Sequence, residues 1–367
     1  MIITSIEELR LCFPAHAYDS IDSLAGVIDN SEHDFLQDKL GTPLYNALCD
    51  WYDEHPTERS RVNSRYLSGE GRQDIGYYNK LLIMAQRVVG FDAMSRAVST
   101  NIISINNAGL NISTSDDYGK VDLAAVDTFK NSCIKEAHAS VNLLLQALEE
   151  WTKKANAATV SEDSSSDEEI DPELKAITDL WKQSRYFYMS TASLIPTAQC
   201  LQGYVNIYDS REKFIQLLPD ILFIQEENIA NAIGDDFLKW IIQQSLSAVD
   251  PGSFLSDIIH RLRKTIAAML VERTQVIKFT KEQRQQAHDD SVRLMQRAIN
   301  DIRAHQDDIL TALGKEHEDI FKKSPLYVAP AVEPASSSEC HADSAQGEPQ
   351  FENNRRTSGM FVTPFLN

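Results

Sequence analysis

Phe35-Leu36-Gln37-Asp38-Lys39-Leu40-Gly41-Thr42-Pro43-Leu44-Tyr45 is matched, further along the chain, by Asn228-Ile229-Ala230-Asn231-Ala232-Ile233-Gly234-Asp235-Asp236-Phe237-Leu238. Each stretch ends an apolar-periodic helix at a glycine and begins a second helix. Aligning Gly41 with Gly234 brings apolar residues into register at Ile21/Phe214, Leu24/Leu217, Ile28/Ile221, Leu36/Ile229, Leu40/Ile233, Leu44/Phe237 and Leu48/Ile241. We interpret this agreement as an internal duplication, which decides the fold before any other feature does.

The order of the expected elements repeats as well. Tyr77 to Val98 is apolar on most sides and predicts a central helix, with Phe254 to Ile277 as its counterpart. Val121 to Trp151 and Lys281 to Leu313 predict a long helix in each half. We therefore expect an all-α fold of two tandem copies, each with a helix pair at a glycine, a central apolar helix and a long helix. The expected hallmark residues of the repeat are Leu40, Gly41, Leu44, Ile233, Gly234 and Phe237.

Local signals near the N-terminus predict where helices begin and end. Ser5 and Glu8 have the spacing of a capping box that opens a short helix. Ser20 to Leu40 has helical apolar spacing, with one break expected near Asn30. Gly41 suits the position just after a helix, and Thr42-Pro43 suits the start of the next one.

One stretch of the first copy departs from the helical pattern. Asn101 to Tyr118 is rich in Asn, Ser and Gly, with apolar residues that alternate. This composition favours either a loop or a small β-hairpin around Asn107-Ala108-Gly109.

Changes in composition indicate the domain boundaries. Residues 155–173 form an acidic, serine-rich linker that carries too little apolar surface to offset the entropy of ordering. The first repeat is therefore expected at 1–154 and the second at 174–323. The second opens at Leu174 to Met189, where an aromatic cluster could be a binding surface or a buried packing contact between the halves. Its members are Tyr186, Phe187 and Tyr188.

The segment 324–367 is expected to be a disordered tail, because prolines and serines dominate its first part. Its end is apolar again, and it either packs on its own chain or docks on a neighbour like a short linear motif. Truncation after Ser324 is then expected to leave the fold intact and to weaken assembly. The candidate docking residues are Phe361, Phe365 and Leu366.

Composition limits the classes of partner and compartment. The net charge of −19 opposes general binding to nucleic acid or to anionic membranes, which require a basic surface. No apolar run approaches the roughly 18 to 20 residues that a membrane span needs. Five scattered cysteines lack any paired spacing and favour a reducing compartment.

The search for catalytic motifs finds neither a phosphate-binding glycine loop nor a nucleophile or zinc motif. Glu316-His317-Glu318 and His288-Asp289-Asp290 place possible ligands side by side, but consecutive helical residues point to different faces. Asp235-Asp236 stand at a helix start, where carboxylates favourably meet the helix dipole. We therefore expect a protein that is not an enzyme, with no catalytic residue, no cofactor and no metal site.

The Leu40-Gly41-Thr42-Pro43-Leu44-Tyr45 segment resembles a recurring phrase in helical head–tail connector proteins of tailed bacteriophages. Over residues 1 to 320, the chain is similar to a larger family from phages and prophages of Bacteroidetes that carries two such units in tandem. The second copy departs from the phrase, with Gly234-Asp235-Asp236 in place of Gly41-Thr42-Pro43. This departure puts in doubt that both units contact the same partner.

The resemblance implies a structural component of the virion, a head–tail connector or neck ring of about a dozen copies closed by heterologous contacts. Its implied partners are further copies of itself, the portal, and tail or neck proteins, without sequence-specific nucleic acid and without membrane. Its implied location is the virion, and the host cytoplasm before assembly. The alternative is a cellular helical adaptor or scaffold that binds proteins through the aromatic cluster.

Overall fold

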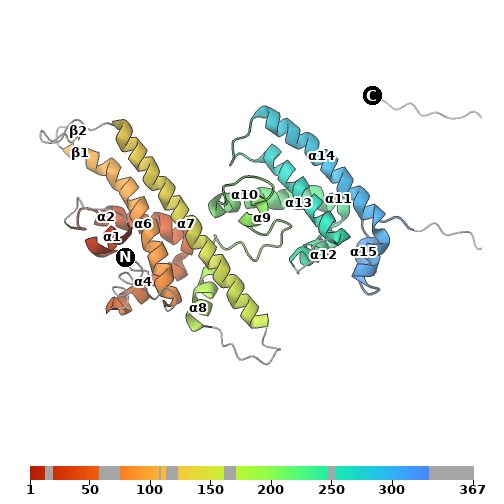
Figure 1. Cartoon of the computed structure of the whole chain (residues 1–367), viewed down its shortest axis with the longest axis horizontal. Helices are drawn as coiled ribbons and strands as arrows, with labels where there is room; N and C mark the ends of the chain where they lie inside the picture. The colour runs from red at the N-terminus through yellow and green to blue at the C-terminus, as the bar shows by residue number, and fades with distance from the viewer. Residues whose placement is uncertain are drawn as a thin grey trace, which may run out of the picture. The chain divides into compact units, whose positions relative to one another are not determined.

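The computed structural model describes residues 1–12, 20–57, 75–106, 109–112, 123–160, 171–246 and 253–329. These residues confirm the all-α class, with a single short hairpin added (Figure 1). Buried apolar side chains gather in two clusters, which we call the first core and the second core. The first core reaches from Ile2 to Tyr186, and the second reaches from Tyr188 to Leu326.

The first core is built around two long helices, α6 and α7, which run side by side (Figure 1). The shorter helices close over them through apolar residues at helical spacing, and the core side chains of α4 and α6 are almost fully buried. The elements of this half are α1 (Ile6–Cys12), α2 (Ala25–Asn30), η1 (Ser31–Leu36), α3 (Gln37–Leu40), α4 (Thr42–Glu54), α6 (Tyr77–Ile102), α7 (Leu123–Val160) and α8 (Pro172–Trp181).

The second core has a comparable long pair, α13 and α14, which also pack along one another. Both of these helices begin at a side-chain cap, since Ser253 accepts from the Ser256 amide and Thr280 forms a capping box with Gln283. The elements of this half are α9 (Ala198–Gln202), α10 (Arg211–Ile224), η4 (Gln225–Ala230), α11 (Asn231–Ile233), α12 (Asp235–Leu246), α13 (Phe254–Arg273), α14 (Lys281–Ala304), α15 (Gln306–Leu313) and α16 (Glu318–Lys322).

The predicted break near Asn30 is a π-helical turn, η1, and a second π-helical turn, η4, stands at the matching place in the other half. Both lead to a glycine with a backbone conformation that side chains disfavour. Gly41 has φ 80° and Gly234 has φ 94°. Glycine is required at both places, so the expected helix end is confirmed. The following helix has Gly41 itself as its N-cap, with Thr42-Pro43 one position further in than expected.

The region that the sequence left open between loop and hairpin contains two strands. Strand β1 (Ile103–Asn106) pairs antiparallel with β2 (Gly109–Ile112), and Asn106 lies opposite Gly109. The strands extend the end of α6.

Two helix boundaries differ from the sequence expectation, and a third was not predicted. The stretch Lys281 to Leu313 is divided at His305 into α14 and α15, where the backbone leaves helical geometry. Helix α8 covers only the first part of the stretch Leu174 to Met189 and ends at Trp181, before the aromatic cluster. Helix α7 continues through the expected start of the linker to Val160, because Ala155 is still buried.

The boundary between the two halves and the start of the tail also differ from the expectation. Helix α8 was placed in the second repeat, yet Ile177 and Trp181 lie in the first core. The expected tail was to start at Ser324, yet Leu326 is buried in the second core. Truncation after Ser324 would therefore remove a core residue, and the cut that tests the tail belongs after Ala329. No helix of the described segments has the length and apolar character of a membrane span.

Candidate functional site

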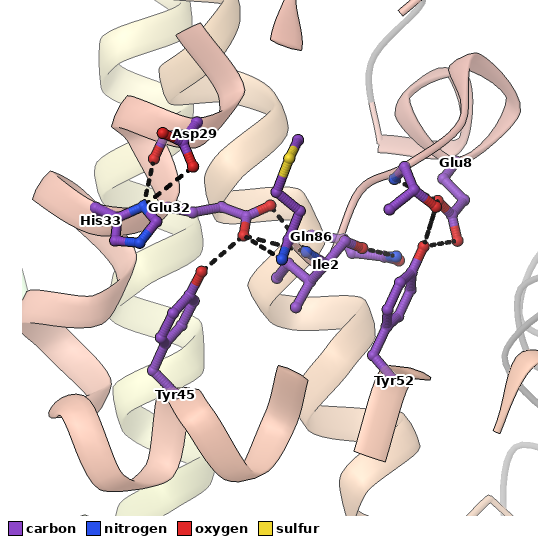
Figure 2. Close-up of polar contacts among 10 residues, drawn as sticks. Ile2, Glu8, Asp29, Glu32, His33, Tyr45, Tyr52 and Gln86 are labelled. Carbon is purple, nitrogen blue, oxygen red and sulfur yellow. Dashed lines mark hydrogen bonds and ion pairs between the residues drawn. The ribbon is translucent and has the colours of Figure 1, made fainter. Parts of the chain in front are cut away.

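The N-terminal segment of the first core is held by a buried polar network (Figure 2). The Ile2 amide donates to both carboxylate oxygens of Glu32, at 2.9 and 3.1 Å, and the Tyr45 hydroxyl donates to the same carboxylate at 2.8 Å. The Gln86 side chain donates to the Ile2 carbonyl at 2.8 Å. Burial raises the pKa of Glu32, while the amide and hydroxyl donors act in the opposite direction.

A second carboxylate fixes the helix that follows this segment. Glu8 and Ser5 form the expected capping box, which is confirmed by reciprocal bonds of 3.2 Å. The Tyr52 hydroxyl donates to Glu8 at 2.7 Å, and the Thr4 amide donates to it at 2.9 Å (Figure 2). Both carboxylates therefore bind their own chain, and their oxygens are already engaged by internal donors.

The second core holds its own leading segment in a corresponding way. The Leu194 amide donates to the Gln225 side-chain oxygen at 2.9 Å, and the Gln225 amide group donates to the Ala192 carbonyl at 3.2 Å. Arg263, on the central helix α13, donates to the Leu194 carbonyl at 2.6 Å. Gln225 stands in η4 as Glu32 does in η1, and Arg263 stands on α13 as Gln86 does on α6. We call each arrangement a backbone clamp.

Gly41 and Gly234 are each covered by a serine from the end of their own half. The Ser184 hydroxyl donates to the Lys39 carbonyl at 2.9 Å, and a Cβ on Gly41 would stand 3.1 Å from the Ser184 Cα. The Ser324 hydroxyl donates to the Ile233 carbonyl at 2.5 Å, and a Cβ on Gly234 would stand 3.3 Å from the Ser324 Cα. Glycine is therefore needed for space as well as for conformation.

The two cores meet where α10 packs on α7, a contact that we call the junction. Arg211 and Glu149, both buried, form an ion pair of 2.7 Å. The Tyr188 hydroxyl donates to Glu149, and Asn142 accepts from the Arg211 amide at 3.0 Å. Burial raises the pKa of Glu149, against the effect of Arg211. Removing one member would leave a buried charge without its partner, which is strongly destabilising.

A second group of charges lies at the same junction around Glu212. Lys39 approaches one of its oxygens at 3.2 Å, and His138 binds the other at 2.6 Å. The hydrogen bond to Glu212 raises the pKa of His138. Burial opposes the charge on Glu212, but His138 and Lys39 outweigh it and the pKa of Glu212 is lowered. The three side chains therefore form a charged contact between α3, α7 and α10.

The aromatic cluster expected from the sequence lies at this junction. Tyr186 and Tyr188 are buried, Tyr186 in the first core and Tyr188 in the second. Phe187 is partly buried and packs against Trp181, with ring centroids 5.1 Å apart. These side chains occupy the packing contact between the halves, which was one of the two interpretations that the sequence left open.

The other expected residues divide into two groups. All four apolar hallmark residues are fully buried, as the repeat pattern requires. They are Leu40, Leu44, Ile233 and Phe237. The apolar tip, with Phe361, Phe365 and Leu366, falls outside the described residues. Within the described segments, His, Cys, Asp and Glu side chains form no group suited to a metal ion.

Residues 36–159 match the model of a family of unknown function, DUF6712. The match covers about a third of the chain and includes the Leu40–Tyr45 phrase, α6 and most of α7. No curated protein and no solved structure matches the chain.

Sequence reasoning missed the serines that cover the glycines. A signal for them exists in Trp181-Lys182-Gln183-Ser184 and Phe321-Lys322-Lys323-Ser324, two stretches with an aromatic residue three positions before a serine. In each, the serine amide donates to the aromatic residue's carbonyl. The separation between these stretches differs from that between the glycines, so an alignment with one fixed offset does not bring them together.

Proposed function

We propose that the two halves are tandem copies of one helical unit. The support is the agreement of three independent details: a π-helical turn before a positive-φ glycine, a clamp on the leading segment, and a serine that covers the glycine. Similar apolar periodicity alone can arise by chance in helical proteins. A buried backbone clamp at the same place in both halves is a more specific likeness, because each clamp requires matched polar groups from three elements.

For the whole chain, we propose a structural component of phage or prophage virions, a non-enzymatic part of the head–tail connector or neck ring. The paired construction around Gly41 and Gly234 is the observation that carries this proposal. It suits a protein that builds an assembly by repeating one unit. The assignment to the connector rests on the resemblance of the Leu40–Tyr45 phrase. The proposed partners are copies of the same chain, the portal, and tail or neck proteins.

The alternative, a cellular adaptor or scaffold, needs an accessible aromatic surface. Tyr186 and Tyr188 are buried at the junction, so such a protein would have to open the contact between its own cores before binding. This requirement makes the adaptor the weaker of the two proposals.

Quantitative peptide mass spectrometry on particles purified from the induced host tests the proposed function. We expect about a dozen copies per particle, the number that a closed ring of the resembled kind would need. Absence of the protein from intact particles would reject the virion component and favour the adaptor.

A further inference from the structure

A wide groove lies beside the junction, between α7 and the start of α10. Its volume is about 780 Å³, and its wall includes two large apolar side chains that are mostly exposed. Tyr208 is 74% exposed and Leu143 is 54% exposed. Apolar side chains that gather in a groove with polar groups around them mark a surface for binding another segment of protein.

The loop that carries Tyr208 holds its backbone in a fixed conformation. Tyr208 and Asp209 both have positive φ, 59° and 52°, which residues other than glycine rarely adopt. The Tyr208 amide donates to the Asn206 side chain at 2.9 Å, and the Asp209 amide donates to the Gln202 side chain at 3.1 Å. The backbone is therefore ordered before anything binds, which lowers the entropy lost on binding. The Asp209 side chain is exposed but is not part of the groove wall.

The charge that the groove offers to a ligand is positive. Lys135 and Lys213 line it, and neither forms an ion pair within the described segments; Lys213 instead lies 4.6 Å from the centroid of the Tyr208 ring. The one carboxylate in the wall, Glu212, is already bound by His138 and by Lys39. The groove is therefore suited to a segment that combines an aromatic ring with acidic groups.

The chain itself contains a segment of this chemistry, Glu348-Pro349-Gln350-Phe351-Glu352. One aromatic residue stands between two acidic residues, and no Lys or Arg occurs between Lys323 and Arg355. The apolar tip is less suitable, because Arg355-Arg356 precede it and the two lysines of the groove would repel them. Of the two aromatic parts of the tail, only residues 348–352 combine a ring with negative charge.

The tail is long enough to reach the groove. The groove lies at the start of α10, and this helix with η4 continues for about 30 Å from Arg211 to Ala230. Helix α12 contacts both η4 and α16, after which the chain leaves the second core. Residues 330–347 span up to about 60 Å when extended, which exceeds this path.

We propose that residues 348–352 dock in this groove of their own chain, with Phe351 between Tyr208 and Leu143. The two flanking glutamates then face the two lysines. The docked segment contacts both α7 and α10, so it ties the tail to the contact between the cores. This inference uses neither the tandem copies nor the virion role, and its failure would leave the proposed function unchanged.

Chymotrypsin digestion of the full chain under native conditions tests this inference, because the protease cleaves after Phe351 and after Phe361. Docking shields the first site and leaves the second as an internal reference. The double variant Lys135→Glu/Lys213→Glu should raise the rate of cleavage after Phe351 at least about tenfold relative to cleavage after Phe361. Mass spectrometry of the released fragments measures both rates.

Two further variants separate net charge from the groove itself. Lys264→Glu/Lys278→Glu makes the same change in net charge with exposed lysines outside the groove, and it should protect Phe351 as the wild type does. Tyr208→Asn removes the aromatic ring, and asparagine accepts a positive φ, so the loop should be retained. This variant should expose Phe351 as the lysine double variant does.

Three results would overturn the inference. The first is equal cleavage after Phe351 in the wild type and in both groove variants. The second is loss of protection in the control variant, which would attribute the effect to net charge. The third is protection that grows with protein concentration, because docking within one chain is independent of concentration and a second copy would then be the occupant.

Discussion

The two cores solve one structural problem with different chemistry. Each must hold a leading segment against its π-helical turn, and the first uses the Glu32 carboxylate while the second uses the Gln225 amide. A carboxylate only accepts hydrogen bonds, whereas an amide accepts and donates, so Gln225 also binds the Ala192 carbonyl. This position therefore requires a hydrogen-bond acceptor at a fixed place, but the acceptor need not be charged.

At the two glycines, by contrast, the residue type cannot vary. Gly41 and Gly234 are the same residue in similar conformations, each covered by a serine. Here no second chemistry is available, because only glycine combines a positive φ with the missing Cβ. The fold therefore requires glycine at Gly41 and Gly234, whereas at Glu32 and Gln225 it accepts either a carboxylate or an amide.

The largest effect is expected from a charge in the helix pair of either core. Leu36→Asp and Ile229→Asp each place a carboxylate where the native side chain is fully buried, and each should lower the free energy of unfolding by about 4 kcal/mol. Urea unfolding measures the loss, and hydrogen exchange shows which core has opened. Leu36→Asp should deprotect α4 and α6 before α12 and α13.

The matched control for these two variants is Leu143→Asp, because Leu143 is 54% exposed on α7. Its effect should remain within about 0.5 kcal/mol. Loss of protection in both cores at once, from either buried variant, would show that the halves unfold as one unit and that comparing them as separate cores is wrong.

The next largest effect is expected at the glycines. Gly41→Ala and Gly234→Ala should each cost about 2 kcal/mol, because strain at positive φ adds to the close approach of Ser184 or Ser324. Gly314→Ala separates the two causes, since Gly314 has φ 71° but no atom within 4 Å of the added Cβ. It should cost about 1 kcal/mol. Equal losses at all three positions would exclude a role for the serines.

Sequence patterns were sufficient for the elements whose residues are close together in the chain. The apolar spacing around Leu36 and Ile229 predicted both helix pairs, and Gly41 predicted the end of the first. Contacts between distant segments could not be read in this way. Nothing near Glu32 indicates that it binds the Ile2 amide, and nothing near Trp181 indicates the core to which it belongs, because both depend on how the chain returns on itself.

The serines should produce a smaller effect than the glycines they cover. Ser184→Ala removes the bond to the Lys39 carbonyl and the bond accepted from the Tyr186 amide, and Ser324→Ala removes the corresponding pair. Each should cost about 1 to 2 kcal/mol in thermal or urea unfolding. Ser23→Ala, at an exposed position, is the control. A large loss for one serine and none for the other would contradict the likeness of the two halves.

The smallest effect concerns pH at the junction, where the halves differ most. The pKa of His138 is raised by Glu212, so its contribution to stability is complete below about pH 6.5, its ordinary value, and is lost as the pH rises through the raised value. Because His138 is half exposed, the change should stay below about 1 kcal/mol. Unfolding midpoints between about pH 5.5 and 8.5 measure it.

His138→Gln should remove this pH dependence and leave the stability at high pH almost unchanged. His305, which is also paired with a carboxylate but lies at the start of α15, supplies the control variant His305→Gln. An unchanged pH profile in His138→Gln would mean that the ion pair with Glu212 contributes nothing to the junction. The contact between the cores would then depend on the Lys39–Glu212 pair, on Arg211 with Glu149 and Tyr188, and on apolar packing.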